Sequence, residues 1–421
     1  MYKKITNILL ILFIIILQTS SLKAETIQIV NLDEQKIKSE TYLLYDRKSK
    51  QILAHKNGFE KIAPASITKV LTSITALELI EQDLSTPYVL PQAVFDGLDP
   101  IASIAWFEPE EELTLKDIIY GIQLPSGADA TRAISYYLTQ DPENLALAMN
   151  EKAQEIGMAN SNFVNTSGLD HENHYSTAYD LALLVDYALE NKDFKELYET
   201  VEYTTSINHI HPNGIGLTNL SLSYALQEDN RYIKGAKSGY TENAGRSLSS
   251  YAEYKGQELI FISLNIFDDE ADGKDPIEDA LYVYDTVFSR YTNNLVMPKN
   301  TIFDSAQIKN GENYSYKLND DLFLYLPIGI SKDDLKIKIN NKPDDLIAPV
   351  AKGTDMGSLK VTYQDKLLYE QDFITTEEIK VNWEGVVKQF FIQLFEILVI
   401  VAIIVGLGLL LYKQVHKPKK R

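Results

Sequence analysis

The sequence contains no cysteine among its 421 residues. This absence excludes disulfides, thiolate nucleophiles, cysteine-ligated zinc and iron–sulfur clusters. Basic residues are also in the minority, since 40 Lys and Arg face 59 Asp and Glu, for a net charge of -19. Nucleic-acid binding relies on clustered Lys and Arg, so we expect no nucleic-acid partner. Glycine-rich phosphate loops are missing as well, and we expect no cofactor.

The N-terminal segment 1–24 is typical of a secretory signal peptide. Lys3 and Lys4 give it a positive start, and Ile8–Leu17 is an uncharged apolar run too short to span a bilayer comfortably. Ala24 supplies a small residue at a plausible cleavage point. The alternative is an uncleaved anchor helix. The signal peptide is the preferred hypothesis, and it places the rest of the chain outside the cytoplasm.

The C-terminal segment 390–412 is predicted to be a transmembrane helix. Between Lys388 and Lys413 its only charge is Glu396, and the run is long enough to cross a membrane. The tail 413–421 is rich in Lys and Arg, which the positive-inside rule places in the cytoplasm. We therefore expect a single-pass protein of the cell membrane with an extracellular body, although a buried helical hairpin is the alternative.

Between the two ends, hydrophobic periodicity predicts strands, then many helices, then strands and one more helix. Strands on either side of Asp46–Lys50 predict a hairpin, and two more strands are expected at 247–254 and 258–265. Apolar residues at helical spacing predict helices at 66–80, 113–124, 129–138, 143–156, 177–189 and 276–291. This order is typical of an α+β domain, which we place at 25–295.

Residues 296–378 have a different character. Gly, Asn, Asp and Pro separate short alternating runs such as Leu322–Leu326 and Ser358–Tyr363. This pattern predicts a small all-β domain. Residues 379–389 are then expected to be a juxtamembrane linker between this domain and the predicted transmembrane helix.

One pair of residues at the start of the first long helix could carry chemistry. Ser66 and Lys69 are at positions i and i+3, so a helix would place the two side chains next to each other. A serine hydroxyl needs an adjacent base to act as a nucleophile, and a lysine serves only if its pKa is lowered. The motif alone is weak evidence, because a serine near a helix start is more often a cap.

Two further segments strengthen the prediction that Ser66 and Lys69 are catalytic. Ser126-Gly127-Ala128 lies in a loop before a predicted helix, and Lys237-Ser238-Gly239 directly precedes the predicted strand pair. Ser-x-x-Lys, a serine loop and Lys-Ser/Thr-Gly occur in this order in penicillin-binding proteins and serine β-lactamases. The similarity extends to the surrounding segments Pro64–Lys69, Asn165–Asp170, Ser176–Ala182 and Gly235–Thr241.

Over about residues 28–295 these segments resemble the low-molecular-mass D-alanyl-D-alanine carboxypeptidases, the DacA-like serine DD-peptidases. The stretch Ala348–Gly353 resembles the C-terminal β domain of that family, and a terminal membrane anchor also fits it. The resemblance implies a β-lactamase/DD-peptidase-like fold, an antiparallel sheet flanked by helices. It also implies peptidoglycan stem peptides ending in D-Ala-D-Ala as substrates and β-lactams as covalent inhibitors.

The resemblance further implies a role for each motif residue. Ser66 would be acylated by the carbonyl of the penultimate D-Ala, Lys69 would take its proton, and Ser126 would relay a proton to the leaving amine. For substrate binding, Lys237 and Ser238 would hold the terminal carboxylate. Gly239 would allow a close approach of the strand edge, and the N–H groups of Ser66 and Tyr240 would form the oxyanion hole.

Ala128 departs from this family's pattern, which has asparagine at the third position of the middle motif. The missing side-chain amide leaves other functions open: a DD-transpeptidase or endopeptidase, a weak β-lactamase, or a catalytically silent wall-binding protein. Two histidine pairs, His171 with His174 and His209 with His211, raise the possibility of zinc. Because their spacing does not match a zinc-peptidase motif, we expect no metal and assign them to the surface or to loop structure.

Overall fold

The computed structural model describes residues 30–228, 230–267 and 274–415. The predicted signal peptide therefore lies outside the described residues. The chain divides into two compact units. The first unit runs up to Asn294 and includes Leu324–Ile330, and the second contains Leu295–Phe323 and the residues from Ser331 onward.

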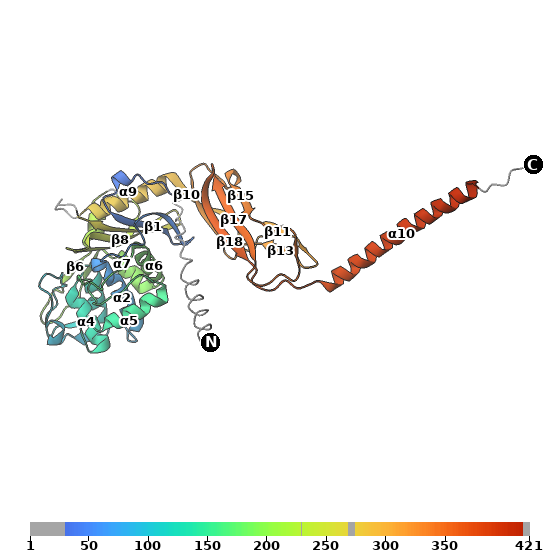
Figure 1. The fold of residues 1–421 in the computed structure, drawn as a ribbon. Helices are drawn as coiled ribbons and strands as arrows, with labels where there is room; N and C mark the ends of the chain where they lie inside the picture. The colour runs from blue at the N-terminus through green and yellow to red at the C-terminus, as the bar shows by residue number, and fades with distance from the viewer. Residues whose placement is uncertain (1–29, 229, 268–273, 416–421) are drawn as a thin grey trace, which may run out of the picture. The chain divides into compact units, whose positions relative to one another are not determined.

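A five-stranded antiparallel sheet forms the frame of the first unit (Figure 1). Its order is β2 (Gln51–Lys56), β1 (Thr41–Asp46), β9 (Gln257–Ile266), β8 (Gly245–Tyr254) and β7 (Ile233–Thr241). The predicted hairpin around Asp46–Lys50 and the predicted strand pair are both confirmed. Because β7 is an edge strand, one side of its backbone is free to meet another element or a ligand.

Helices cover both faces of this sheet. On one face lie α2 (Thr68–Leu79), α3 (Leu115–Gln123), α4 (Ala128–Thr139), α5 (Leu145–Ile156), α6 (Ala178–Ala188) and α7 (Lys192–Glu199). On the other face lie α8 (Leu220–Gln227) and α9 (Asp275–Arg290). The mixed α+β architecture is thus confirmed, and the six predicted helices are present with shifted ends. The helices α7 and α8 were not predicted.

Helix α2 is the centre of the helical lobe. Every residue from Thr68 to Ala76 is buried, so the helix is enclosed on all sides rather than amphipathic. A 3-10 turn at Ala65–Ile67 precedes it, where the sequence predicted that the helix would already have begun. Two short strand pairs complete the unit, β3 (Pro87–Val89) with β4 (Glu112–Thr114) and β5 (Glu202–Thr204) with β6 (Gly216–Thr218).

The second unit is built from strands, as the sequence predicted. Its largest sheet has three antiparallel strands, β15 (Lys336–Asn340), β17 (Asp355–Tyr363) and β18 (Lys366–Ile374). The shorter strands are β10 (Tyr291–Met297), β11 (Asp304–Ala306), β12 (Ile308–Lys309), β13 (Tyr314–Tyr316), β14 (Leu322–Pro327) and β16 (Leu346–Ile347). Part of β14 groups with the first unit, because Tyr325 is buried there and its hydroxyl donates to Asp46.

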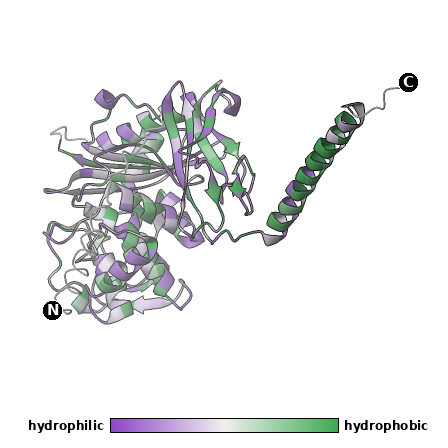
Figure 2. Cartoon of the chain, turned by 45° about the vertical axis from the view of Figure 1, so that its right-hand side comes forward, coloured by the Kyte–Doolittle hydropathy of each residue, from purple (hydrophilic) through white to green (hydrophobic). Residues whose placement is uncertain are grey.

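The last element is α10 (Trp383–Val415), whose side chains are almost all apolar along most of its length (Figure 2). Among the described residues it is the one helix that is long and apolar enough to cross a membrane. It begins inside the segment that the sequence assigned to a linker. The reason is local, since the Asn382 side chain accepts a hydrogen bond from the Gly385 N–H and caps the first turn.

Candidate active site

Ser66 and Lys69 meet as the spacing of the motif predicts. Ser66 lies in the 3-10 turn before α2, and Lys69 is in the first turn of that helix. The Lys69 Nζ is 3.0 Å from the Ser66 Oγ and donates a hydrogen bond of 2.7 Å to the Ser167 carbonyl. Only 3% of Lys69 is exposed. Burial lowers the pKa of this amine to about 7, and the charge of Asp129 opposes part of the shift.

This environment prepares Lys69 to accept a proton. A neutral amine has two N–H groups and one lone pair. When the Ser167 carbonyl accepts one N–H, the lone pair can face the Ser66 hydroxyl. Near neutral pH a large fraction of Lys69 is in this neutral form, since its pKa is about 7.

Ser167 was not predicted to have a role, because it acts through its backbone carbonyl. Its loop is shaped by Asn165, whose side-chain oxygen accepts hydrogen bonds from the N–H groups of Ser167 and Gly168. Gly168 has a φ of +86°, and a Cβ at this position would lie 1.9 Å from the Ala65 carbonyl oxygen. The Asn-x-x-Gly spacing is therefore the sequence feature that could have indicated this contact.

Ser126 is in an unusual conformation just before α4. Its φ is +65°, in the left-handed region that costs energy for residues other than glycine. Its hydroxyl oxygen is buried and has no hydrogen-bond partner among the described residues. Strained residues of this kind concentrate at functional sites. The helix that follows, α4, packs against α2.

Strand β7 brings the third motif to the turn that carries Ser66. Lys237 is 2% exposed and donates to the Ser238 carbonyl. Burial lowers the pKa of Lys237 well below its ordinary value, and the charge of Lys69 lowers it further. An anion that entered the site would favour the charged form of Lys237 again. Ser238 and Tyr240 are exposed on the same strand.

Gly239 sets how closely β7 approaches Ser66. A Cβ on Gly239 would lie 2.7 Å from the Ser66 backbone nitrogen and 3.0 Å from the Ala65 Cβ. Both neighbours belong to the 3-10 turn, which cannot rotate away as a flexible side chain could. Thus β7 and the turn that carries Ser66 are in direct contact at Gly239.

We expect Gly239→Ala to lower the rate of Ser66 acylation about 10- to 100-fold, because the added methyl group moves the strand edge away from Ser66. The measurement is the rate of covalent labelling by a fluorescent penicillin. Gly216→Ala is the matched control, since a Cβ there meets no atom within 4 Å. Equal rates for the two variants would contradict the close contact.

His174 has a structural role at Thr68, which is close to Ser66 in sequence. It is 3% exposed, its Nδ1 accepts from the Val164 N–H at 3.2 Å, and its Nε2 lies 2.8 Å from the Thr68 Oγ1. Because Nδ1 is an acceptor, the ring proton is on Nε2 and is donated to Thr68. His174 thus orders the loop around Thr68, in line with a loop-structuring histidine. His211 lies 2.7 Å from the buried Glu111, and His209 is exposed.

The His174 environment predicts a loss of stability in acid. Burial lowers the pKa of His174 to about 4, so the unfolded chain takes up this proton first as the pH falls. We expect about 3 kcal/mol of unfolding free energy to be lost between pH 6.5 and pH 4. The measurement is denaturant unfolding of the full chain in detergent across this range. His174→Gln should lack this part of the pH dependence, whereas an identical slope in both proteins would contradict the assignment.

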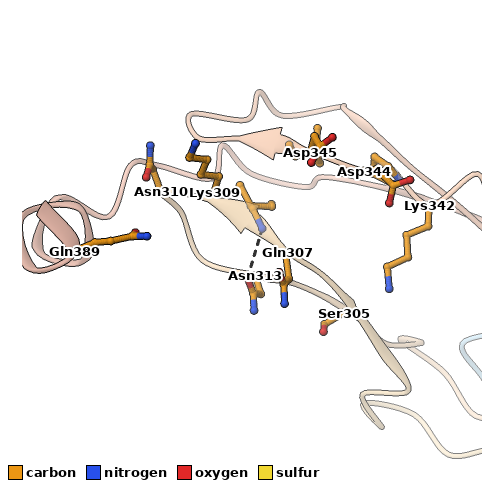
Figure 3. Close-up of a pocket in the computed structure, with 12 residues that line it drawn as sticks. Ser305, Gln307, Lys309, Asn310, Asn313, Lys342, Asp344, Asp345 and Gln389 are labelled. Atoms are coloured by element: carbon orange, nitrogen blue, oxygen red, sulfur yellow. Dashed lines mark hydrogen bonds between the residues drawn. The ribbon is translucent and has the colours of Figure 1, made fainter. Parts of the chain in front are cut away.

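A polar hollow in the second unit is separate from the three motifs (Figure 3). It encloses about 940 Å³ and is lined by Ser305, Gln307, Ile308, Lys309, Asn310, Asn313, Lys342, Pro343, Asp344, Asp345, Leu346 and Gln389. None of the motif residues belongs to it. The candidate active site is instead the contact between the Ser66 turn and β7 in the first unit.

Comparisons with known proteins identify the family. A family model described as D-alanyl-D-alanine carboxypeptidase matches residues 28–268, which is more than half of the chain. A second model, described as Penicillin-binding protein 5, C-terminal domain, matches residues 291–381.

Individual relatives cover most of the chain. The D-alanyl-D-alanine carboxypeptidase DacF of Bacillus subtilis is 26% identical over 346 residues, covering 80% of this chain and 85% of the relative. DacA of Escherichia coli is 26% identical over 355 residues, covering 82% of this chain and 84% of the relative. The crystal structure of penicillin binding protein 5 from Haemophilus influenzae shares the fold, with a TM-score of 0.66 at 22% identity, covering 83% of this chain and 99% of that one. The chain belongs to the D-alanyl-D-alanine carboxypeptidase family of serine-type peptidases.

Proposed function

We propose that this protein is a membrane-anchored serine-type D-Ala-D-Ala carboxypeptidase that acts on peptidoglycan stem peptides at the extracellular face of the cell membrane. The observation that carries the proposal is the 3.0 Å contact between the Ser66 hydroxyl and a buried lysine whose pKa is lowered to about 7. That pair is a nucleophile and a general base in position to react.

In the proposed reaction, the Ser66 oxygen attacks the carbonyl of the penultimate D-Ala while Lys69 takes the hydroxyl proton. The N–H groups of Ser66 and Tyr240 stabilise the oxyanion. The intermediate collapses by breaking the peptide bond, and Ser126 relays a proton to the nitrogen of the departing D-Ala. Water then attacks the acyl-enzyme ester, with Lys69 as the base, to release the shortened peptide and restore the Ser66 hydroxyl.

The substrate carboxylate is assigned to β7. Lys237 is buried with no acidic partner among the described residues, so a terminal carboxylate would supply the missing opposite charge. Ser238 would donate a hydrogen bond to the same group, and Gly239 would leave room for the substrate beside the strand. Since β-lactams present a carboxylate and a reactive amide, they would acylate Ser66 as covalent inhibitors.

Each segment of the chain is assigned a place that fits a protein anchored at the extracellular face of the cell membrane. Residues 1–24 form the signal peptide and 25–295 the catalytic domain, followed by the β domain at 296–378 and the juxtamembrane segment at 379–389. Residues 390–412 span the membrane within α10, and the basic tail 413–421 is cytoplasmic. The apolar character of α10 supports the anchor.

The direct test is release of D-Ala from a peptide ending in D-Ala-D-Ala by the full chain in detergent, together with labelling by a fluorescent penicillin. We expect both activities. Labelling without D-Ala release would favour a transpeptidase, for which an amine acceptor is then supplied. The absence of both would contradict the proposal and indicate a silent wall-binding protein, as Ala128 allows.

A further inference from the structure

One exposed aromatic side chain lies beside the middle motif and has no role in the proposed reaction. Trp106 is 67% exposed, and its φ is +67°. A left-handed backbone is unfavourable for a bulky residue, and an indole left in water gives up the benefit of burial. Its neighbours Ala105 and Phe107 are both buried. Both neighbours of Trp106 are thus held in the protein interior, and the Trp106 side chain between them is exposed to solvent.

A buried carboxylate holds the loop in this shape. Asp129 accepts hydrogen bonds from the Ala105 N–H at 2.8 Å and from the Phe107 N–H at 3.1 Å. Charge-assisted bonds of this kind are among the stronger hydrogen bonds in proteins. These bonds fix the backbone immediately before and after Trp106. The fold therefore determines where the Trp106 backbone lies.

The same loop lies directly against the middle motif. The Ala128 N–H donates to the Ser103 carbonyl at 2.8 Å, and a Cβ on Gly127 would lie 2.8 Å from the Ala105 Cβ. The charge of Asp129 also acts on the pKa of Lys69. The loop that carries Trp106 is therefore packed directly against the segment that follows Ser126.

We propose that Trp106 forms part of the substrate groove and contacts the side chain of the residue that precedes D-Ala-D-Ala. This inference rests on the proposed function of the site. An indole presents a flat apolar face that packs well on a long aliphatic side chain. A contact on the acyl side of the scissile bond lets the enzyme favour peptides with a long side chain over peptides with none.

The test compares two peptides, diacetyl-Lys-D-Ala-D-Ala and acetyl-Gly-D-Ala-D-Ala, with the full chain in detergent. We expect wild type to prefer the lysine peptide. In Trp106→Ala this preference should fall about 10-fold through a higher KM, with kcat nearly unchanged and the glycine peptide unaffected. Trp106→Phe should keep most of the preference, because it retains an aromatic face. Ile101→Ala is the matched control, since Ile101 is an 84% exposed apolar residue before the same loop.

Three outcomes separate this inference from the proposed function. If wild type cleaves neither peptide, the proposed function fails. If wild type is active and Trp106→Ala weakens both peptides equally, Trp106 has only a structural role and the inference is overturned. If Trp106→Ala changes neither peptide, the exposed indole serves another partner, and the inference is overturned as well.

Fluorescence gives an independent measure. The chain has two tryptophans, Trp106 and Trp383, so Trp383→Phe leaves Trp106 as the only indole. In a Ser66→Ala background, which binds peptide without reacting, the lysine peptide should shift or quench the emission more strongly than the glycine peptide. Emission that does not respond to saturating lysine peptide would contradict direct contact.

Discussion

Replacing Ser66 with alanine is expected to reduce D-Ala release at least about 1,000-fold and to abolish covalent labelling by penicillin. The substitution removes the oxygen that is proposed to form the acyl-enzyme bond, while the partly exposed position and the small size of alanine leave the fold intact. Lys69 keeps its hydrogen bond to the Ser167 carbonyl. The measurement is D-Ala release beside labelling of the full chain by fluorescent penicillin, read on a denaturing gel.

Ser73→Ala provides the matched control, because Ser73 lies in α2, the helix that directly follows the Ser66 turn. Its hydroxyl is buried and has no hydrogen-bond partner among the described residues, so its loss should change neither folding nor activity. If Ser66→Ala still formed a covalent adduct with penicillin, another residue would be the nucleophile and Ser126 would be the first candidate. If both variants lost activity, the effect would lie in the packing of α2.

The sequence predicted the structure correctly where a local pattern of residues determines it. The i, i+3 spacing placed Lys69 against Ser66, and hydrophobic periodicity predicted six of the helices. The sequence did not predict contacts that are long-range and that are made by backbone atoms. The Ser167 carbonyl reaches Lys69 from a distant loop, and the Asn-x-x-Gly spacing of that loop is the one local pattern that points to it. Similarly, Tyr325 belongs to the first unit because of where it is buried, not because of its neighbours in sequence.

The effect of Ala128 on the site also depends on contacts that the sequence alone does not show. The sequence alone raises doubt, because the family's asparagine is missing there. In the structure, Lys69 already contacts Ser66 and the Ser167 carbonyl, so no amide at position 128 is required to place the general base. The Ala128 N–H is used to hold Ser103, which belongs to the loop carrying Trp106. The departure at this position therefore leaves the contact between Lys69 and Ser66 in place.

The burial that activates Lys69 also has a cost in stability. An unfolded lysine has a pKa of about 10.4, whereas the pKa of Lys69 is about 7 in the folded protein. The unfolded chain therefore binds this proton more tightly, and at pH 7 the difference disfavours folding by roughly 4 kcal/mol. The cost is present below pH 7, decreases as the pH rises from 7 to about 10.4, and vanishes above it.

Lys69→Met is accordingly expected to inactivate the enzyme and to stabilise it. D-Ala release should fall about 100- to 10,000-fold, since the general base is lost. Methionine fills a similar volume without a buried amine, and after the loss of one hydrogen bond to Ser167 the net gain should be about 2–3 kcal/mol at pH 7. In wild type, acylation should rise with pH through about 7, because only neutral Lys69 takes the proton from Ser66.

Denaturant unfolding of both proteins in detergent at pH 7 and pH 10 separates this cost from ordinary packing effects. The advantage of Lys69→Met should shrink at the higher pH, where wild type no longer loses stability by neutralising Lys69. Lys192→Met is the control, because Lys192 is exposed at the start of α7 and should change stability little at either pH. A Lys69→Met protein that is less stable than wild type at pH 7 would mean that Lys69 is charged and well paired in the folded state. The site would then need a different base, and the reaction proposed for Ser66 would have to be redrawn around it.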